Sequence, residues 1–352
     1  MAAFIVAEIG KNFIQTLAEE PVAEYLAKAK RLVDAAATAG VDAVKFQTHE
    51  VEDEQLDTLI IAPHFDGADR YSWVARNTRA TPLDDFWRPL KAYTEQKGLV
   101  FFSTPMSRAA ARKLNQLAVP MWKVGSGDAL DFVLLNYLAE TGKPIILSTG
   151  MVSLAELDQV IKYLRDRGAP LTILYCVSRY PCPPEQFNLA TLEDLRDKYP
   201  EVAVGFSDHS LGEEAALAAV KLGATVVEKH FSFSRELWGS DHKVSMSPEE
   251  MAHLVRAIRA AEHRQIDHRP FYGQRGRELE GAQNLFRPYF HRTLVASVDL
   301  PAGAKLGKEQ IYSLRPQKHL AGLPSSDYEK ALGRRLKRPL KKYEAIKKDD
   351  LV

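Results

Sequence analysis

Two histidines end consecutive apolar runs near the middle of the chain, and their side chains are suited to bind a divalent cation. His209 lies in SDHS and His230 in EKHF, each at the end of a predicted strand. If these strands are neighbours in a barrel, both imidazoles reach one cation, and water and substrate oxygens supply the other ligands. The pair therefore predicts an open Mn²⁺ or Mg²⁺ site. A hydrogen-bonded role in the core is the alternative for either histidine.

Two lysines and three serines form a second group, which is suited to bind an anion. Lys45 and Lys123 end predicted strands, where an unpaired buried ammonium is costly, so we expect an anionic partner. Three serines end other strands beside glycine-rich turns and helix starts, where free N–H groups attract phosphate: Ser126, Ser148 and Ser207. The group predicts a site for a phosphate or a carboxylate. A Schiff base on a desolvated lysine is the competing chemistry.

Three carboxylates are placed for proton transfer or for activating water: Glu8, Asp128 and Asp241. Glu8 follows the apolar FIVA, where burial would raise its pKa. Asp241, in GSDHKVS, also fits an ordinary loop turn. We expect Glu228 to alternate away from the rim relative to His230, where it could equally pair with a helix.

These residues end short, β-rich apolar runs, each followed by an amphipathic helical pattern. The runs cover residues 4–9, 43–46, 99–103, 121–124, 144–147, 171–175, 202–206 and 225–231. Strand–helix alternation repeated in this way predicts a parallel (β/α)8 TIM barrel rather than an open sheet.

In such a barrel the carboxyl ends of the strands share one rim, where the active site lies. Every predicted strand ends in a polar cluster, from AEIGKN and VKFQTH to FSDHS and EKHF. Helix capping explains any single cluster, but it explains the whole set poorly. The segment 50–82, between the second strand and its helix, is expected to cover the site.

The pattern changes after about residue 270, where short strands and a Pro-Ala-Gly turn predict a small, mainly β module. We expect a barrel over 1–270, a linker over 271–285 and the module over 286–352. Residues 283–352 hold 15 Lys and Arg against 7 Asp and Glu, whereas residues 1–282 hold 32 against 39. The basic module lacks interleaved aromatic residues and nucleic-acid motifs, so we expect it to face a small anion or an acidic surface.

Composition places the chain among ordinary globular proteins, with 45% hydrophobic and 26% charged residues. The opening MAAFIVAEIG has no basic segment or small-residue cleavage site, and no apolar window is long enough to span a bilayer. The only cysteines, Cys176 and Cys182, indicate no disulfide framework. These features predict a cytoplasmic protein.

The chain resembles the sialic acid synthase (N-acetylneuraminate synthase) family. The matching segments occur in family order: AEIGKN, AVKFQTH, FFSTPMS, KVGSGD, KPIILSTGM, YCVSRYP, GFSDHSLG, GATVVEKHFSF and GSDHKVSMSPEEM. The tail, with HRTLVASVDLPAGAKL, is similar to the SAF or antifreeze-like domain that follows the barrel in this family.

The resemblance implies a metal-dependent condensation of phosphoenolpyruvate with N-acetylmannosamine or a related acylamino-sugar, with Mn²⁺ preferred and Mg²⁺ or Co²⁺ as alternatives. His209 and His230 would hold the metal. Phosphoenolpyruvate would be held by Lys45, Lys123, Ser126, Ser148 and Ser207. Glu8, Asp128, Asp241 and Tyr180 would be the catalytic residues. The remaining substrate contacts would come from Gln47, Thr104, Ser178 and Arg292. The family also implies a domain-swapped homodimer, in which Arg292 of one tail caps the sugar site of the other chain.

Three positions depart from the family pattern: Phe13 replaces a frequent histidine, Ser178 an occasional asparagine and Asp128 a frequent glutamate. None of them removes a proposed metal or phosphate ligand. They leave sialic, legionaminic and pseudaminic acids open as products. A Schiff-base aldolase using Lys45 or Lys123, and a non-catalytic sugar-phosphate-binding protein, are the rival functions.

Overall fold

The computed structural model describes residues 3–60 and 69–352, and its larger part is a barrel of parallel strands. The strands are β1 (Phe4–Gly10), β2 (Ala43–Thr48), β3 (Val100–Pro105), β4 (Trp122–Val124), β5 (Ile145–Ser148), β6 (Leu171–Cys176), β7 (Ala203–Asp208) and β8 (Val226–His230). They form one 8-stranded sheet in the order β3-β2-β1-β8-β7-β6-β5-β4, and β3 packs against β4 to close the ring. The predicted barrel is therefore confirmed.

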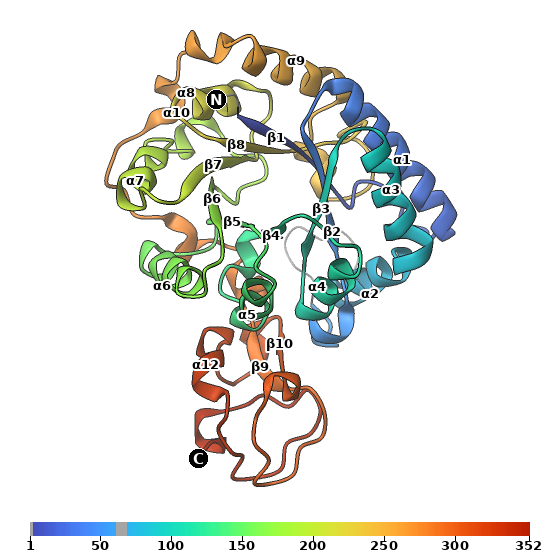
Figure 1. Cartoon of the computed structure of the whole chain (residues 1–352), viewed down its shortest axis with the longest axis vertical. Helices are drawn as coiled ribbons and strands as arrows, with labels where there is room; N and C mark the ends of the chain where they lie inside the picture. The colour runs from blue at the N-terminus through green and yellow to red at the C-terminus, as the bar shows by residue number, and fades with distance from the viewer. Residues whose placement is uncertain (1–2, 61–68) are drawn as a thin grey trace.

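Helices surround the strands (Figure 1). They are α1 (Val22–Ala39), α2 (Arg70–Ala80), α3 (Arg88–Gln96), α4 (Arg108–Asn115), α5 (Phe132–Glu140), α6 (Leu154–Arg165), α7 (Thr191–Lys198), α8 (Glu214–Lys221) and α9 (Pro248–Arg259). Side-chain caps fix where several begin: Ser153 and Ser247 each form a capping box with the glutamate three residues later. None of the helices in the described ranges has the length and apolar character that a bilayer crossing requires.

The barrel interior consists of an apolar layer below a polar one. The apolar layer contains Val6, Ala43, Phe102, Ile146, Leu174 and Val226. Side chains alternate along a strand, so the residue two positions later points into the same interior. Those next residues are Glu8, Lys45, Thr104, Ser148, Cys176 and Glu228, and all of them line a cavity at the carboxyl ends of the strands.

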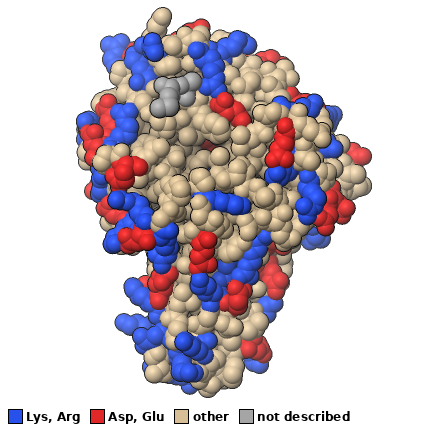
Figure 2. Space-filling model, viewed as in Figure 1, with Lys and Arg blue, Asp and Glu red and all other residues tan. Residues whose placement is uncertain are grey.

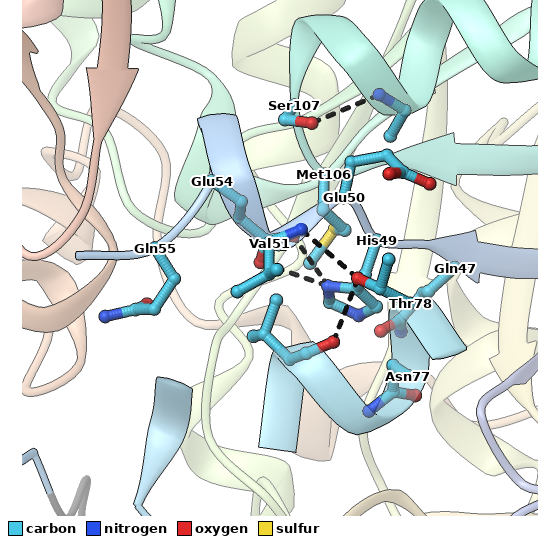
Figure 3. Close-up of polar contacts among 12 residues, drawn as sticks. Gln47, His49, Glu50, Val51, Glu54, Gln55, Asn77, Thr78, Met106 and Ser107 are labelled. Carbon is cyan, nitrogen blue, oxygen red and sulfur yellow. Dashed lines mark hydrogen bonds and ion pairs between the residues drawn. The ribbon is translucent and has the colours of Figure 1, made fainter. Parts of the chain in front are cut away.

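The segment 50–82 is partly helical rather than a continuous loop. It contains a short 3-10 turn at Val51–Asp53 and helix α2, while residues 61–68 lie outside the described part. His49 Nδ1 lies 2.8 Å from a Glu54 carboxylate oxygen, and the Val51 N–H donates to Thr78 Oγ1 at 3.1 Å (Figure 3). The first contact folds the segment after β2 back on itself, and the second joins this segment to α2.

The C-terminal module extends from one side of the barrel, next to α5 (Figure 1). After the short helices α10 (Arg269–Tyr272) and α11 (Arg287–Phe290), β9 (Thr293–Ala296) and β10 (Ile311–Leu314) pair antiparallel, and α12 (Tyr328–Ala331) follows. Lys and Arg side chains are prominent on its visible face (Figure 2). A small, mainly β module is confirmed; the domain limits 1–270, 271–285 and 286–352 stay a prediction.

Backbone and side-chain hydrogen bonds join the module to the barrel. The Arg315 N–H donates to Glu54 O at 3.1 Å, and the Leu56 N–H donates to Arg315 O at 2.9 Å. On α4, the buried Arg108 guanidinium donates to Lys308 O at 2.7 Å and to Ile311 O at 2.8 Å. The module is thus docked by main-chain groups of residues 54–56 and by the Arg108 side chain.

Replacing Arg108 with methionine should weaken this docking. Two module carbonyls would lose a charged donor in a buried place, at a cost of about 2 kcal/mol in the free energy of unfolding. Amide hydrogen exchange of β9 and β10 should become faster, and chemical denaturation should show the lost stability.

Arg112→Met is the matched control on the same helix. Its ion pair with Glu309 is exposed, so its loss should change the free energy of unfolding by less than about 1 kcal/mol. Equal effects of the two substitutions would contradict the proposed docking role of Arg108.

Candidate active site

A cavity of about 470 Å³ opens where the carboxyl ends of the barrel strands meet. It brings together every site residue predicted from the sequence except Arg292. These residues are Glu8, Lys45, Gln47, Thr104, Lys123, Ser126, Asp128, Ser148, Ser178, Tyr180, Ser207, His209, His230 and Asp241. The strand ends thus converge on one site, as a barrel requires.

Lys45 is at the centre of the cavity floor, between two carboxylates. Its Nζ lies 2.7 Å from Glu8 Oε2 and 3.5 Å from Glu228 Oε1, and it donates to Thr104 Oγ1 at 3.1 Å. Burial lowers the pKa of Lys45, but Glu228 and Glu8 outweigh burial and raise it. The Lys45 ammonium therefore stays protonated.

Unlike Lys45, which stays charged, Glu8 lies in an environment that favours the neutral form of its side chain. Burial, together with the nearby Glu228 carboxylate, raises the pKa of Glu8 to about 7, although Lys45 opposes the shift. The Gln47 side-chain amide donates to Glu8 Oε1 at 2.8 Å, and Lys11 Nζ donates to Gln47 Oε1 at 2.9 Å. Glu8 can thus gain or lose a proton near neutral pH.

Lys123 forms the second cationic point on the floor. Its Nζ donates to Ser148 Oγ at 2.7 Å and lies 3.8 Å from Glu228 Oε1. Burial lowers the pKa of Lys123. Ser207 Oγ donates to Glu228 Oε1 at 3.4 Å, so Ser207 contacts the same carboxylate oxygen that lies near Lys123. Ser126 Oγ accepts from the Gly150 N–H at 3.0 Å.

The expected outward position of Glu228 is wrong. Glu228 lines the cavity and lies between Lys45 and Lys123. Residues two apart on a strand point to the same face, so Glu228 follows His230 and Val226 into the barrel. The alternation within VVEKH was the signal that, correctly applied, would have placed Glu228 in the cavity.

The rings of the two histidines are neighbours in the cavity lining, with centroids 5.5 Å apart. His209 Nδ1 donates to Val177 O at 2.9 Å, which leaves Nε2 as an acceptor. His230 Nδ1 is buried without a hydrogen-bond partner in the described ranges. Burial lowers the pKa of His230 to about 3, so its ring is neutral. The Tyr180 ring lies 4.1 Å from that of His209.

A hydrogen-bonded cluster encloses Asp128. Arg292 Nε donates to Asp128 Oδ1 at 2.9 Å, and Arg315 Nη2 donates to the same oxygen at 2.7 Å. Arg292 lies outside the cavity lining. Within this chain, Arg292 contacts the Asp128 of its own barrel, whereas the resemblance implied a contact with another chain. A swapped dimer stays a prediction.

Sequence reasoning missed several residues that line the cavity. They are Lys11, Arg70, Met106, Cys176, Glu228, Ser240, Lys243, Leu285, Phe286 and Phe290. Cys176 follows the strand alternation and could have been found from it. Phe290 is brought in by α11, and the missing side chain of Gly127 leaves room for its ring, since a Cβ there would lie 2.6 Å from Phe290 Cδ1. No local pattern predicts such a contact.

Phe13, one of the three departures from the family pattern, is a core residue. Its ring is buried, and its centroid lies 4.9 Å from that of Phe86. Phe13 does not line the cavity. Its difference from the family pattern therefore does not change the lining of the cavity.

The chain is similar to known proteins along nearly its whole length. Residues 32–269 match the NeuB family and residues 291–352 match the SAF domain. The chain is 31% identical to the N-acetylneuraminate-9-phosphate synthase of Homo sapiens, over 88% of this chain and 82% of that protein. It is 33% identical to the N,N'-diacetyllegionaminic acid synthase of Legionella pneumophila, over 96% of this chain and 91% of that protein. The crystal structure of the spore coat polysaccharide biosynthesis protein SpsE of Bacillus subtilis superposes with a TM-score of 0.79 at 29% identity, covering 100% of this chain and 95% of that one.

The raised pKa of Glu8 predicts a pH-dependent stability. Between its ordinary pKa and about 7, folded Glu8 keeps a proton that the unfolded chain has released. This stabilising contribution is full below pH 4.5 and is lost as the pH rises through about 7. The urea midpoint should thus fall between pH 5.5 and pH 8, and it should fall less in Glu8→Gln. Glu24→Gln, at an exposed carboxylate, should keep the wild-type dependence; an unchanged Glu8→Gln profile would contradict the shift.

Proposed function

Because the chain belongs to the NeuB family and ends in a SAF domain, we propose that it condenses phosphoenolpyruvate with an acylamino-sugar to give a nonulosonate and phosphate. One observation supports this reaction most directly: two buried lysines, surrounded by hydroxyl groups, and a histidine pair line the same cavity. The floor suits an anionic enol phosphate, and the histidines suit an aldehyde activated beside it.

Lys45, Lys123 and the serines around them are the groups that would bind phosphoenolpyruvate. Two ammonium groups and several hydroxyl donors match its phosphate and carboxylate oxygens. The enzyme would hold the enol carbon beneath the sugar aldehyde. A carbon–carbon bond then forms between them as the enol and carbonyl π bonds open, and the aldehyde oxygen takes up a proton. Water adds at the carbon that bears the phosphate and gives up a proton, and the bond from this carbon to the phosphate oxygen breaks to leave a ketone and free phosphate.

The histidine pair fits an open divalent site. His209 and His230 each have a ring nitrogen that could bind a metal ion, and among the described residues no group of three or more His, Cys, Asp or Glu is arranged to hold one. Remaining ligands would come from water and substrate oxygens. A bound Mn²⁺, or Mg²⁺ or Co²⁺ in its place, would supply Lewis-acid polarisation of the aldehyde.

Carboxylates and Tyr180 would orient the sugar and move protons. Glu8 is suited to exchange a proton near neutral pH, because its pKa is about 7. Asp241 and Tyr180 line the cavity on the histidine side, whereas Asp128 is fixed by two arginines. Sialic, legionaminic and pseudaminic acids are all compatible products, since relatives of each type match the chain at 30% identity or more.

The Schiff-base alternative requires a neutral lysine. Lys45 fits this role poorly, because two carboxylates keep it protonated. Lys123, whose pKa burial lowers, is the better candidate. Trapping with borohydride in the presence of pyruvate would reveal such an adduct.

Phosphate release from phosphoenolpyruvate, assayed with a panel of amino-sugars and Mn²⁺, tests the proposal. We expect release with at least one sugar, loss of activity on chelation and no borohydride adduct. His209→Ala and His230→Ala should each lower kcat/KM by about 1000-fold, because several kcal/mol of carbonyl activation is lost. His253→Ala, at an exposed histidine, is the control. Release that is insensitive to chelation and to both substitutions would refute the metal-dependent reaction.

We also propose that the chain acts in the cytoplasm as a homodimer in which tails are exchanged. In such a swap, the Arg292–Asp128 contact forms between chains instead of within one. Mixing inactive His209→Ala with inactive Arg292→Ala protein, after dissociation and reassembly, should restore part of the activity, because one site per mixed dimer is intact. Absence of restoration in verified mixed dimers would show that each tail serves its own barrel.

A further inference from the structure

A buried ion pair lies beside the two histidines, within the barrel wall. Lys229 Nζ is 2.7 Å from Asp208 Oδ2, and the side chains are 1% and 0% exposed. The two residues stand opposite each other in the β7–β8 register. Asp208 directly precedes His209, and Lys229 directly precedes His230.

Ser210 completes the network on the other side of His209. Its N–H donates to Asp208 Oδ1 at 2.7 Å, and its hydroxyl donates to Asp208 Oδ2 at 3.1 Å. Lys229 Nζ donates to Ser210 O and to Ser210 Oγ, both at 3.0 Å. All three N–H groups of the ammonium therefore have acceptors. The network holds the residues on both sides of His209 to the residue before His230.

Neither member of the pair touches the cavity. Ser207, Glu228 and His230 line it, so strand alternation directs Asp208 and Lys229 to the opposite face. Any effect of the pair on the site must pass through the backbone at the histidines.

Stability alone is a weak reason for this pair. Removing two charges from water is costly, and apolar residues of similar size are often as stable in such a place. The ionic network instead fixes the relative position of two backbone segments, because its hydrogen bonds join residues that are next to His209 and His230 in the chain. We infer that Asp208 and Lys229 are positioning residues, which set the separation and orientation of His209 and His230 for the divalent cation. This inference rests on the proposed function.

The double variant Asp208→Asn/Lys229→Met tests the inference. It removes both charges while keeping side chains of similar size. Binding of Mn²⁺ alone, followed by electron paramagnetic resonance of the free ion, should weaken by about 10 to 100-fold, as for other groups that orient metal ligands. Phosphoenolpyruvate binding in chelated buffer should not change. If the double variant does not fold, Ser210→Ala, which removes only the hydroxyl, should still weaken Mn²⁺ binding several-fold.

Arg259→Met serves as the control for losing an ion pair. Its partner Asp42 lies at the amino-terminal end of the strands, far from the cavity in the fold, so Mn²⁺ binding should equal that of the wild type. Wild-type Mn²⁺ affinity in a folded double variant would overturn the positioning role and leave the proposed reaction standing. Absence of Mn²⁺ binding by the wild-type protein would overturn both the metal site and this inference.

Discussion

The ammonium groups of Lys45 and Lys123 lie inside the barrel mouth, and Glu228 lies within 3.5 Å of one and 3.8 Å of the other. Buried charges are tolerated only when they are paired, so the carboxylates on the floor keep the two lysine cations inside the cavity. Glu8 adds an adjustable charge, because its pKa is about 7. A bound anion would favour the protonated form of Glu8, which leaves the floor more positive. Proton uptake and substrate binding are thereby linked.

Much of the fold follows from the alternation of side chains, and this part was predictable. Each predicted apolar run corresponds to a strand of the barrel, with ends that differ by a few residues. The same alternation places Val226, Glu228 and His230 on one face, so the wrong expectation for Glu228 came from misapplying a sound rule. The polar residues at the strand ends were sufficient to predict that Lys45, Lys123 and both histidines share one cavity.

Other features depend on contacts between segments that are distant in sequence. Arg292 and Arg315 meet at Asp128, and Phe290 comes close to Gly127 because no side chain is present there. Each of these contacts requires the module to be docked, and docking depends on main-chain groups that no residue pattern reveals. The sequence therefore predicted the polar residues of the barrel cavity better than the contacts that the C-terminal residues make with the barrel.

The joint between Arg315 and residues 54–56 consists of two hydrogen bonds between peptide groups, which form an isolated parallel β-bridge between Gln55 and Arg315. Every amino acid except proline has the same peptide group, so the hydrogen bonds of this joint do not depend on the side chain at Leu56. Side chains around the mouth can then diverge among relatives while the module keeps its register. Such a joint would allow one scaffold to acquire new sugar preferences without having to re-evolve its own assembly.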